Sequence, residues 1–166
     1  MNVMIFKYAL PIITIIMLSN CGYKLRNYEN IFQDASIQIL FEDTKLNQEF
    51  VSLFQSTQNV GSLIQNNANI ETDFIIEIYI HSLDKYSIAL DRGIQTSEAR
   101  LEYSLEYSIK SEDSTQKYFD QIFFEKSFPY DESRILAGNI QQEIILREFI
   151  SKAIRTIILS AKLRFK

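Results

Sequence analysis

Cysteine, histidine and tryptophan are nearly or wholly missing from this 166-residue chain, which has one Cys, one His and no Trp. A single cysteine excludes a disulfide framework, and with a single histidine it also excludes a Cys/His zinc cluster. Lys and Arg number 17 against 21 Asp and Glu, so the chain lacks the basic surplus that neutralises nucleic-acid phosphates. We therefore expect no metal site and no nucleic-acid partner.

Glycine and proline are also scarce, at 4 and 2 residues, and no Pro-rich, Gly/Ser-rich or repeated stretch marks a linker. Hydrophobic residues make up 46% of the chain and charged residues 23%, which is ordinary for a packed globular protein. A chain of this length has room for one compact domain and a short additional segment. We therefore expect a single domain over residues 21–166.

Residues 1–20 have the features of a secretory signal peptide. Lys7 is their only charge, and residues 8–18 form an almost wholly apolar run. The run is eleven residues long, whereas a membrane-spanning helix needs about 20. A cleaved signal therefore fits residues 1–20 better than a membrane anchor does.

The end of this segment, Leu18-Ser19-Asn20-Cys21, resembles the lipobox of bacterial lipoprotein signal peptides. The resemblance implies that Cys21 becomes the acylated first residue of the mature chain, although Asn20 stands where the family has Gly, Ala or Ser. Each buried methylene of an acyl chain contributes about 0.8 kcal/mol, so more than one chain would hold the protein at a bilayer. Gly22 rather than Asp follows the cysteine, which by resemblance implies the outer membrane. The alternative is a free thiol after conventional cleavage.

The pattern of apolar residues after Gly22 predicts an α+β fold, in which a small four-stranded sheet is packed by two helices in the order β-α-β-β-β-α. The predicted strands cover residues 36–41, 73–84, 97–111 and 116–128. The predicted helices run from about 44 to 59–61 and from 139 to about 163. Asn139, with Gln142 three residues on, has the pattern of an N-terminal capping box for the second helix.

The strand at 97–111 alternates perfectly, which predicts one sheet face against the helices and one face in water. Its apolar residues are Ala99, Leu101, Tyr103, Leu105, Tyr107 and Ile109, and polar residues separate them. In the strand before it, one face is predicted to carry Phe74, Ile76, Ile78 and Ile80. Ile75 and Tyr79 make the other face of that strand partly apolar, so a covering layer is expected on both sides.

Three stretches of the mature chain, together with this order of elements, resemble the lipopolysaccharide-assembly lipoprotein LptE of Gram-negative bacteria. They are Cys21–Arg26, Asp91–Ala99, and Phe123–Phe124 continued by Ile135–Glu143. No stretch is diagnostic alone, so the resemblance depends on their conjunction. The chain departs from the family at Gly138, where a Lys is often found.

The resemblance implies a non-enzymatic lipoprotein that plugs and helps to assemble the outer-membrane β-barrel LptD, which delivers lipopolysaccharide to the outer leaflet. The chain would then be held at the outer membrane by acyl chains on Cys21, facing the periplasm and within the barrel lumen. Arg92, in the turn between two strands, aligns with a basic residue of the family and would bind a lipid phosphate. A solvated turn cation is the alternative for Arg92.

Two other classes of function stay open. An enzyme would need a site, but His81 has only Asp84 and Lys85 nearby, without a second imidazole, a nucleophile motif or a glycine-rich phosphate loop. We therefore expect no enzyme, no cofactor and a hydrogen-bonded His81 ring within a strand. The remaining alternative is a lipoprotein accessory of another envelope machine, such as a pilotin or a cell-wall synthase activator.

Overall fold

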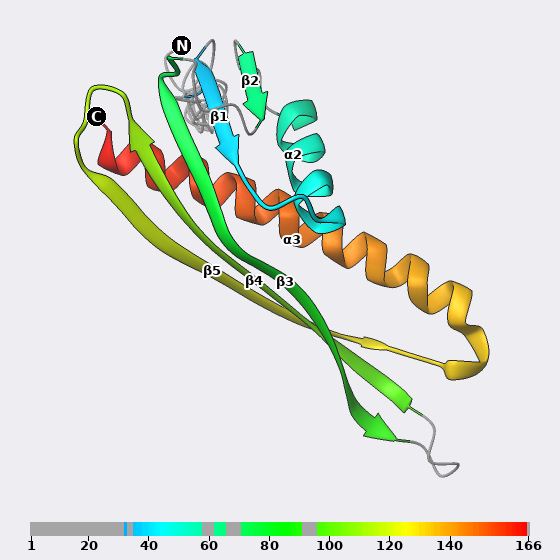
Figure 1. The fold of residues 1–166 in the computed structure, drawn as a ribbon. Helices are drawn as coiled ribbons and strands as arrows, with labels where there is room; N and C mark the ends of the chain where they lie inside the picture. The colour runs from blue at the N-terminus through cyan, green and yellow to red at the C-terminus, as the bar shows by residue number, and fades with distance from the viewer. Residues whose placement is uncertain (1–31, 33–34, 58–61, 66–70, 91–95, 166) are drawn as a thin grey trace, which may run out of the picture.

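A computed structural model describes residues 32, 35–57, 62–65, 71–90 and 96–165, which form one mixed five-stranded sheet with two helices (Figure 1). The elements are β1 (Ser36–Leu40), α2 (Lys45–Thr57), β2 (Ser62–Gln65), β3 (Phe74–Leu90), β4 (Thr96–Ser111), β5 (Lys117–Pro129), the 3-10 turn η1 (Glu132–Arg134) and α3 (Ile135–Arg164). The α+β class and the order of the predicted strands and helices are confirmed. Neither α2 nor α3 is both long and apolar enough to cross a membrane.

The sheet has the strand order β2-β1-β3-β4-β5. β1 is parallel to both β2 and β3, while β3, β4 and β5 form an antiparallel meander. Strand β2, in which Leu63 lies opposite Ile37 of β1, is not among the strands predicted from the sequence. A strand of four residues has too few apolar positions to produce a recognisable alternation, so its pairing with β1 is visible only in the structure.

Thr44 begins α2, because its hydroxyl oxygen accepts a hydrogen bond from the Asn47 amide at 3.2 Å. The helix buries Phe50, Val51 and Phe54 against the sheet. A parallel pair of strands needs a crossover connection, and α2 supplies it between β1 and β2.

Both helices lie on the same face of the sheet. The Phe50 ring of α2 packs edge-on to His81 of β3 with ring centroids 5.8 Å apart, and Phe149 of α3 lies 5.9 Å from Tyr103 of β4. The inward side chains of β4 are all buried: Ala99, Leu101, Tyr103, Leu105, Tyr107 and Ile109. The alternation predicted for this strand is therefore confirmed.

Ile80 lies on the face opposite to the one predicted. The pairing with β4 passes from Ile78↔Tyr107 directly to Ile80↔Glu106, so Tyr79 is the extra residue of a β-bulge. Beyond the bulge the side chains exchange faces, and His81 takes the inward position that the prediction gave to Ile80. A bulge depends on the pairing of two strands, so alternation along one strand does not reveal it.

The predicted N-cap at Asn139 is wrong, because α3 begins at Ile135. Asp131 caps η1, and its carboxylate accepts a hydrogen bond from the Ser133 amide at 2.8 Å. α3 follows η1 without a break, so the chain is already helical before it reaches Asn139, which is exposed. The start of α3 therefore depends on the short turn before it rather than on the Asn-x-x-Gln pattern.

Candidate functional site

The face of the sheet opposite α2 and α3 carries exposed aromatic and aliphatic side chains among polar ones. Phe119 and Phe123 on β5 are 64% and 55% exposed, and Tyr79, Ile80 and Tyr86 on β3 are 44–49% exposed. No helix of the described residues covers this face, which we call the open face. Exposed apolar groups gathered on one face of a soluble domain are typical of a surface that contacts another molecule.

An aromatic and charged cluster gives one end of the open face a fixed shape. The Tyr79 and Phe119 rings stack with centroids 5.8 Å apart, and the Lys117 ammonium lies 5.3 Å from the Tyr79 centroid. Glu77 binds Lys117 and accepts a hydrogen bond from the Tyr79 hydroxyl at 2.9 Å. The Lys117 bond lowers the pKa of Glu77, and the same bond raises the pKa of Lys117, so both groups stay charged near neutral pH. These contacts hold the rings without a partner present.

The covered face contains a pocket of about 660 Å³ between α2, β3 and α3. Charged side chains of both signs line it, among them Lys45 and Glu49 of α2 and Glu143 and Arg147 of α3. Mixed charges do not select a ligand of one sign. His81 of β3 also lines the pocket.

Hydrogen bonds on both ring nitrogens hold His81 in one tautomer. The Asn47 side-chain amide donates to the Glu42 carbonyl at 2.9 Å, which turns Asn47 Oδ1 toward His81 Nδ1 at 2.6 Å. Nδ1 therefore carries the proton, and Nε2 accepts from the Tyr103 hydroxyl at 2.8 Å. Burial lowers the pKa of His81 to about 4, so the ring is neutral at pH 7. The predicted satisfied ring is confirmed.

The enzyme alternative gains nothing from the surroundings of His81. In the register of β3 and β4, Asp84 lies opposite Glu102 on the open face, whereas His81 lies opposite Leu105 on the covered face. The side chains of Asp84 and His81 therefore lie on opposite sides of β3. Both ring nitrogens are engaged by Asn47 and Tyr103. The geometry is that of a buried polar contact which orients α2 on the sheet.

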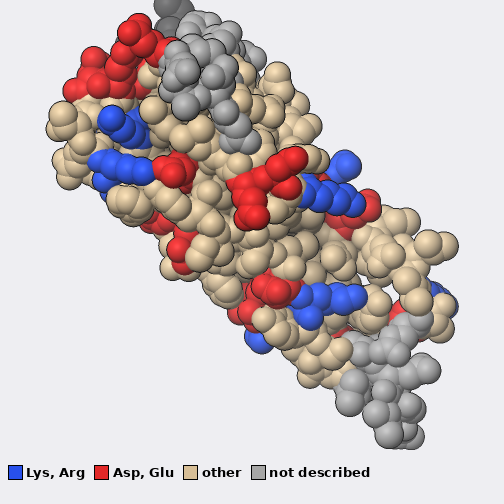
Figure 2. All heavy atoms as spheres, in the orientation of Figure 1, with Lys and Arg blue, Asp and Glu red and all other residues tan. Residues whose placement is uncertain are grey.

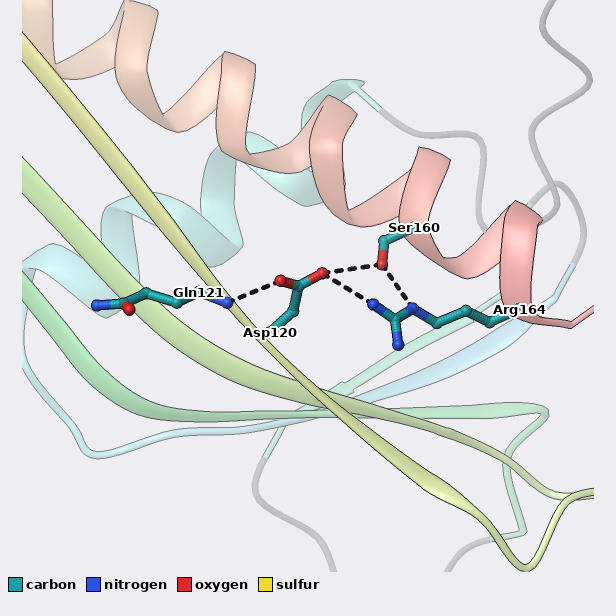
Figure 3. Close-up of polar contacts among 4 residues, drawn as sticks. All are labelled: Asp120, Gln121, Ser160 and Arg164. Carbon is teal, nitrogen blue, oxygen red and sulfur yellow. Dashed lines mark hydrogen bonds and ion pairs between the residues drawn. The ribbon is translucent and has the colours of Figure 1, made fainter.

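Asp120 fastens the last turns of α3 to β5 (Figure 3). Its Oδ2 accepts hydrogen bonds from the Ser160 hydroxyl and from Arg164 Nη2, both at 3.2 Å. Arg164 also donates to Ser160 at 3.1 Å and lies over the Tyr118 ring, 5.1 Å from its centroid. Oδ1 accepts from the backbone amide of Gln121 at 2.9 Å. One carboxylate therefore joins a helix end to the edge strand of the sheet.

Many of the charged side chains on the surface of the described residues lie beside a charge of the opposite sign. Figure 2 shows Lys and Arg side chains beside Asp and Glu side chains on the face in view, with broad uncharged surface between them. Ion pairs among the described residues include Lys126 with Glu148 and Arg100 with Glu102, whose charged atoms are 2.6 and 3.1 Å apart.

The two residues predicted to act in function, Cys21 and Arg92, lie outside the described residues. Gly138 is described, and α3 there approaches Tyr130 so closely that an added Cβ would lie 2.7 Å from Tyr130 Cε2. Lys85 Nζ lies 4.5 Å from the centroid of the same ring. The position where the LptE family often has a lysine is thus a tight helix-to-ring contact in this chain.

The apolar character of the open face along β5 was not predicted from the sequence. The alternation within β5 places Tyr118, Ile122, Phe124 and Phe128 on the core side, where Ile122 and Phe128 are buried and the other two are partly buried. The signal that was overlooked is the pair Phe119 and Phe123, which occupies the alternate positions of the same strand.

Comparison with solved structures finds bacterial lipoproteins. Rare lipoprotein B from Shewanella oneidensis matches 76% of this chain and 93% of its own with a TM-score of 0.57 and 17% identity. Lipoprotein B from Nitrosomonas europaea matches 87% of this chain and 94% of its own with a TM-score of 0.56 and 15% identity. A minor lipoprotein from Acinetobacter baumannii matches 74% and 87%, with a TM-score of 0.50 and 13% identity.

Sequence comparisons give no further assignment, because no protein-family model and no curated protein matches the chain. At these identities the structural matches show a shared fold. The chain therefore has the fold of solved bacterial lipoproteins over nearly their whole length.

Proposed function

We propose that this protein is an outer-membrane lipoprotein that seats in the lumen of the β-barrel LptD and helps that barrel to assemble and to deliver lipopolysaccharide to the outer leaflet. The observation that carries the proposal is the open face of the sheet, on which Tyr79, Ile80, Phe119 and Phe123 are exposed among polar and charged neighbours. A surface of this mixed kind suits the polar inner wall of a barrel. The fold shared with solved lipoproteins and the lipobox-like residues before Cys21 support it.

The proposed roles divide along the chain. Acyl chains on Cys21 would tether the domain to the membrane, because two chains hold a protein at a bilayer where one does not. The sheet and its two helices would act as a rigid body, since they share one core and Asp120 of β5 binds Ser160 and Arg164 of α3. Arg92 belongs to the connection between β3 and β4, where a guanidinium would bind a lipid phosphate through two parallel hydrogen bonds. No covalent chemistry is required of any residue.

Gentle detergent extraction of membranes tests this proposal. The wild-type chain should come out in a stable complex of about one-to-one stoichiometry with a large outer-membrane barrel, because an interface that encloses a plug exceeds about 2,000 Å². Ile80→Asp should reduce the recovery of the barrel, since it places a charge on the open face, while Leu163→Asp should not. Leu163 is the matched control because it is an exposed leucine at the end of α3.

Recovery of the wild-type lipoprotein with a secretin or a cell-wall synthase would replace this proposal by the accessory role in another envelope machine. Recovery mainly as a free monomer would refute the barrel partnership. Equal recovery of the barrel with Ile80→Asp and wild type would remove the open face from the interface.

A further inference from the structure

Strand β3 has a free edge beyond the end of β1 in the described part of the chain. β1 ends at Leu40, which lies opposite Glu77, whereas β3 continues to Leu90 (Figure 1). On its other side β3 stays paired with β4 along this length, apart from its bulges. A free strand edge presents backbone donors and acceptors to which another strand can be added.

The hydrogen bonds of β4 identify which backbone groups of β3 point out of this edge. The Tyr130 amide donates to the Ser97 carbonyl at 3.1 Å, so odd-numbered residues of β4 bond to β5 and even-numbered ones bond to β3. The Glu112 amide, which donates to the Asp73 carbonyl at 3.1 Å, agrees with this assignment. Beyond the bulge at Tyr79, the residues of β3 that lie opposite even-numbered residues of β4 are themselves even-numbered.

The backbone N–H and C=O groups of His81, Leu83 and Lys85 therefore point away from β4. Among the described residues, no hydrogen bond joins these groups to another group. Four steps of about 3.4 Å separate His81 from Lys85, so the free row is about 14 Å long. It can pair with about five residues of an added strand.

The pocket of the covered face lies beside this row. The side chains of His81 and Leu83 line the pocket, and Leu46 of α2 and Leu146 of α3 add apolar surface to it. Side chains of a strand alternate between the two faces of its sheet. A strand added to β3 would therefore place every second side chain toward the space between α2 and α3.

The charges at the pocket suit a ligand that carries both signs. Glu49 and Arg147 lie 4.0 Å from each other across the pocket. Lys45 of α2 and Glu143 of α3 are exposed and make no ion pair with another described residue. An extended peptide with one acidic and one basic side chain can satisfy both of them, whereas a phosphate group can satisfy only the lysine.

From this edge and the pocket beside it we propose that β3 binds an extended segment of a partner protein by strand addition at His81, Leu83 and Lys85. Backbone hydrogen bonds along the edge would supply affinity, and alternate side chains in the pocket would supply specificity. The segment carries an acidic residue for Lys45, a basic residue for Glu143 and an apolar residue for the leucines of the pocket. One segment occupies one chain, so the inference is compatible with a one-to-one complex and adds a contact on the covered face.

A phage-displayed library of random nine-residue peptides, selected on the purified full chain, tests the proposal. Selected peptides should carry an acidic and a basic residue an even number of positions apart, because only every second side chain of an added strand enters the pocket. Synthetic versions of these peptides give dissociation constants by fluorescence polarisation. Lys45→Glu should weaken their binding at least fivefold, and exchange of the acidic residue of the peptide for lysine should restore it.

Proline at position 85 tests the backbone pairing. Proline lacks an N–H, and the N–H lost here points away from β4, so the pairing of β3 with β4 is kept. Lys85→Ala removes the same side chain and keeps the N–H. Lys85→Pro should therefore bind the selected peptides at least tenfold more weakly than Lys85→Ala, while circular dichroism shows the same fold for both variants.

N-methylated peptides repeat this test without a change in the protein. In an added strand, one alternate set of amides faces β3 and the other set faces away. Methylation of one set should therefore weaken binding at least tenfold, and methylation of the other set should leave it within threefold.

Equal binding by Lys85→Pro and Lys85→Ala, or equal binding of the two methylated forms, would overturn the proposal, because the ligand would then be held by side chains alone, as a carbohydrate or a lipid headgroup is. A library that yields no peptide sensitive to Lys45→Glu would also overturn it. These measurements use the purified chain without any barrel, so their failure leaves the partnership with LptD untouched, and failure of that partnership leaves them valid.

Discussion

At the scale of single residues, His81 shows how a buried polar group is accommodated in the core. Asn47 and Tyr103 occupy both ring nitrogens, and the arrangement requires the neutral ring. Protonation would turn Nε2 into a hydrogen-bond donor. The Tyr103 hydroxyl could then no longer donate to Nε2, and its proton would need another acceptor. The neutral state of His81 is therefore built into the packing of α2 on β3.

The stability of the domain should fall as the pH drops from 7 to 5. Burial lowers the pKa of His81 from its ordinary value of 6.5 to about 4 in the folded chain. Between pH 7 and pH 5 the His81 ring therefore becomes protonated in the unfolded chain but stays largely neutral in the folded chain. The contribution of neutral His81 to the free energy of unfolding is present above pH 6.5 and is lost as the pH falls toward 4. The loss between pH 7 and pH 5 is about 2 kcal/mol. Urea denaturation at both pH values measures it.

His81→Gln is the control for this pH dependence, because glutamine keeps hydrogen-bonding capacity and does not titrate. His81 is the only histidine in the chain. The loss between pH 7 and pH 5 should therefore shrink to less than half in the variant. An undiminished loss would assign the effect to carboxylates instead.

Cys21 is the residue on which the proposed membrane attachment depends, since it ends the apolar run of residues 8–18. Intact-mass measurement of the mature wild-type chain should show a first residue Cys21 that carries acyl chains. Cys21→Ala should yield a chain without acylation at that position. A mature wild-type chain that begins at Gly22, or at an unmodified Cys21, would contradict the lipobox interpretation.

At the scale of elements, β4 has the clearest division between its two faces. Leu105 is fully buried, whereas Glu106 on the open face accepts a hydrogen bond from the Gln121 side chain at 3.3 Å. Leu105→Asp should lower the free energy of unfolding by more than about 3 kcal/mol, because it buries an unpaired charge. Glu106→Lys should change it by less than about 1 kcal/mol. Thermal denaturation followed by circular dichroism compares them, and equal damage would mean that the faces are assigned incorrectly.

What the sequence could predict about the elements follows from how local each signal is. The faces of β4 and the start of α2 were predictable, because alternation and the Thr44 cap are contained in a few neighbouring residues. The bulge at Tyr79 and strand β2 depend on pairing with other strands, so they appear only when the sheet is assembled. The start of α3 was predicted too late because the cap at Asp131 begins a 3-10 turn first.

The candidate site was less predictable than the fold. The sequence shows Phe119 and Phe123 at alternate positions of β5, but their exposure depends on which face of the sheet α3 covers. The hydrogen bonds of His81 to Asn47 and Tyr103 join three separate elements. The roles predicted for Cys21 and Arg92 came from resemblance and stay predictions.

At the scale of the whole molecule, the two faces of the sheet differ in role, because one face forms the core and the other is exposed. One face receives α2 and α3 and supplies the core (Figure 1). The open face combines exposed rings with polar side chains. A domain arranged in this way is complete in its own packing and still has a surface suited to a larger partner. The barrel proposal depends on that surface being covered in the cell.

Photo-crosslinking in cells from position 80 tests this claim most directly. A photoreactive amino acid in place of Ile80 would sit on the open face, where the native side chain is 49% exposed. Illumination should attach the chain covalently to a large outer-membrane barrel, identified by mass spectrometry as the LptD partner. An adduct with a secretin or a cell-wall synthase, or no adduct at all, would contradict the account.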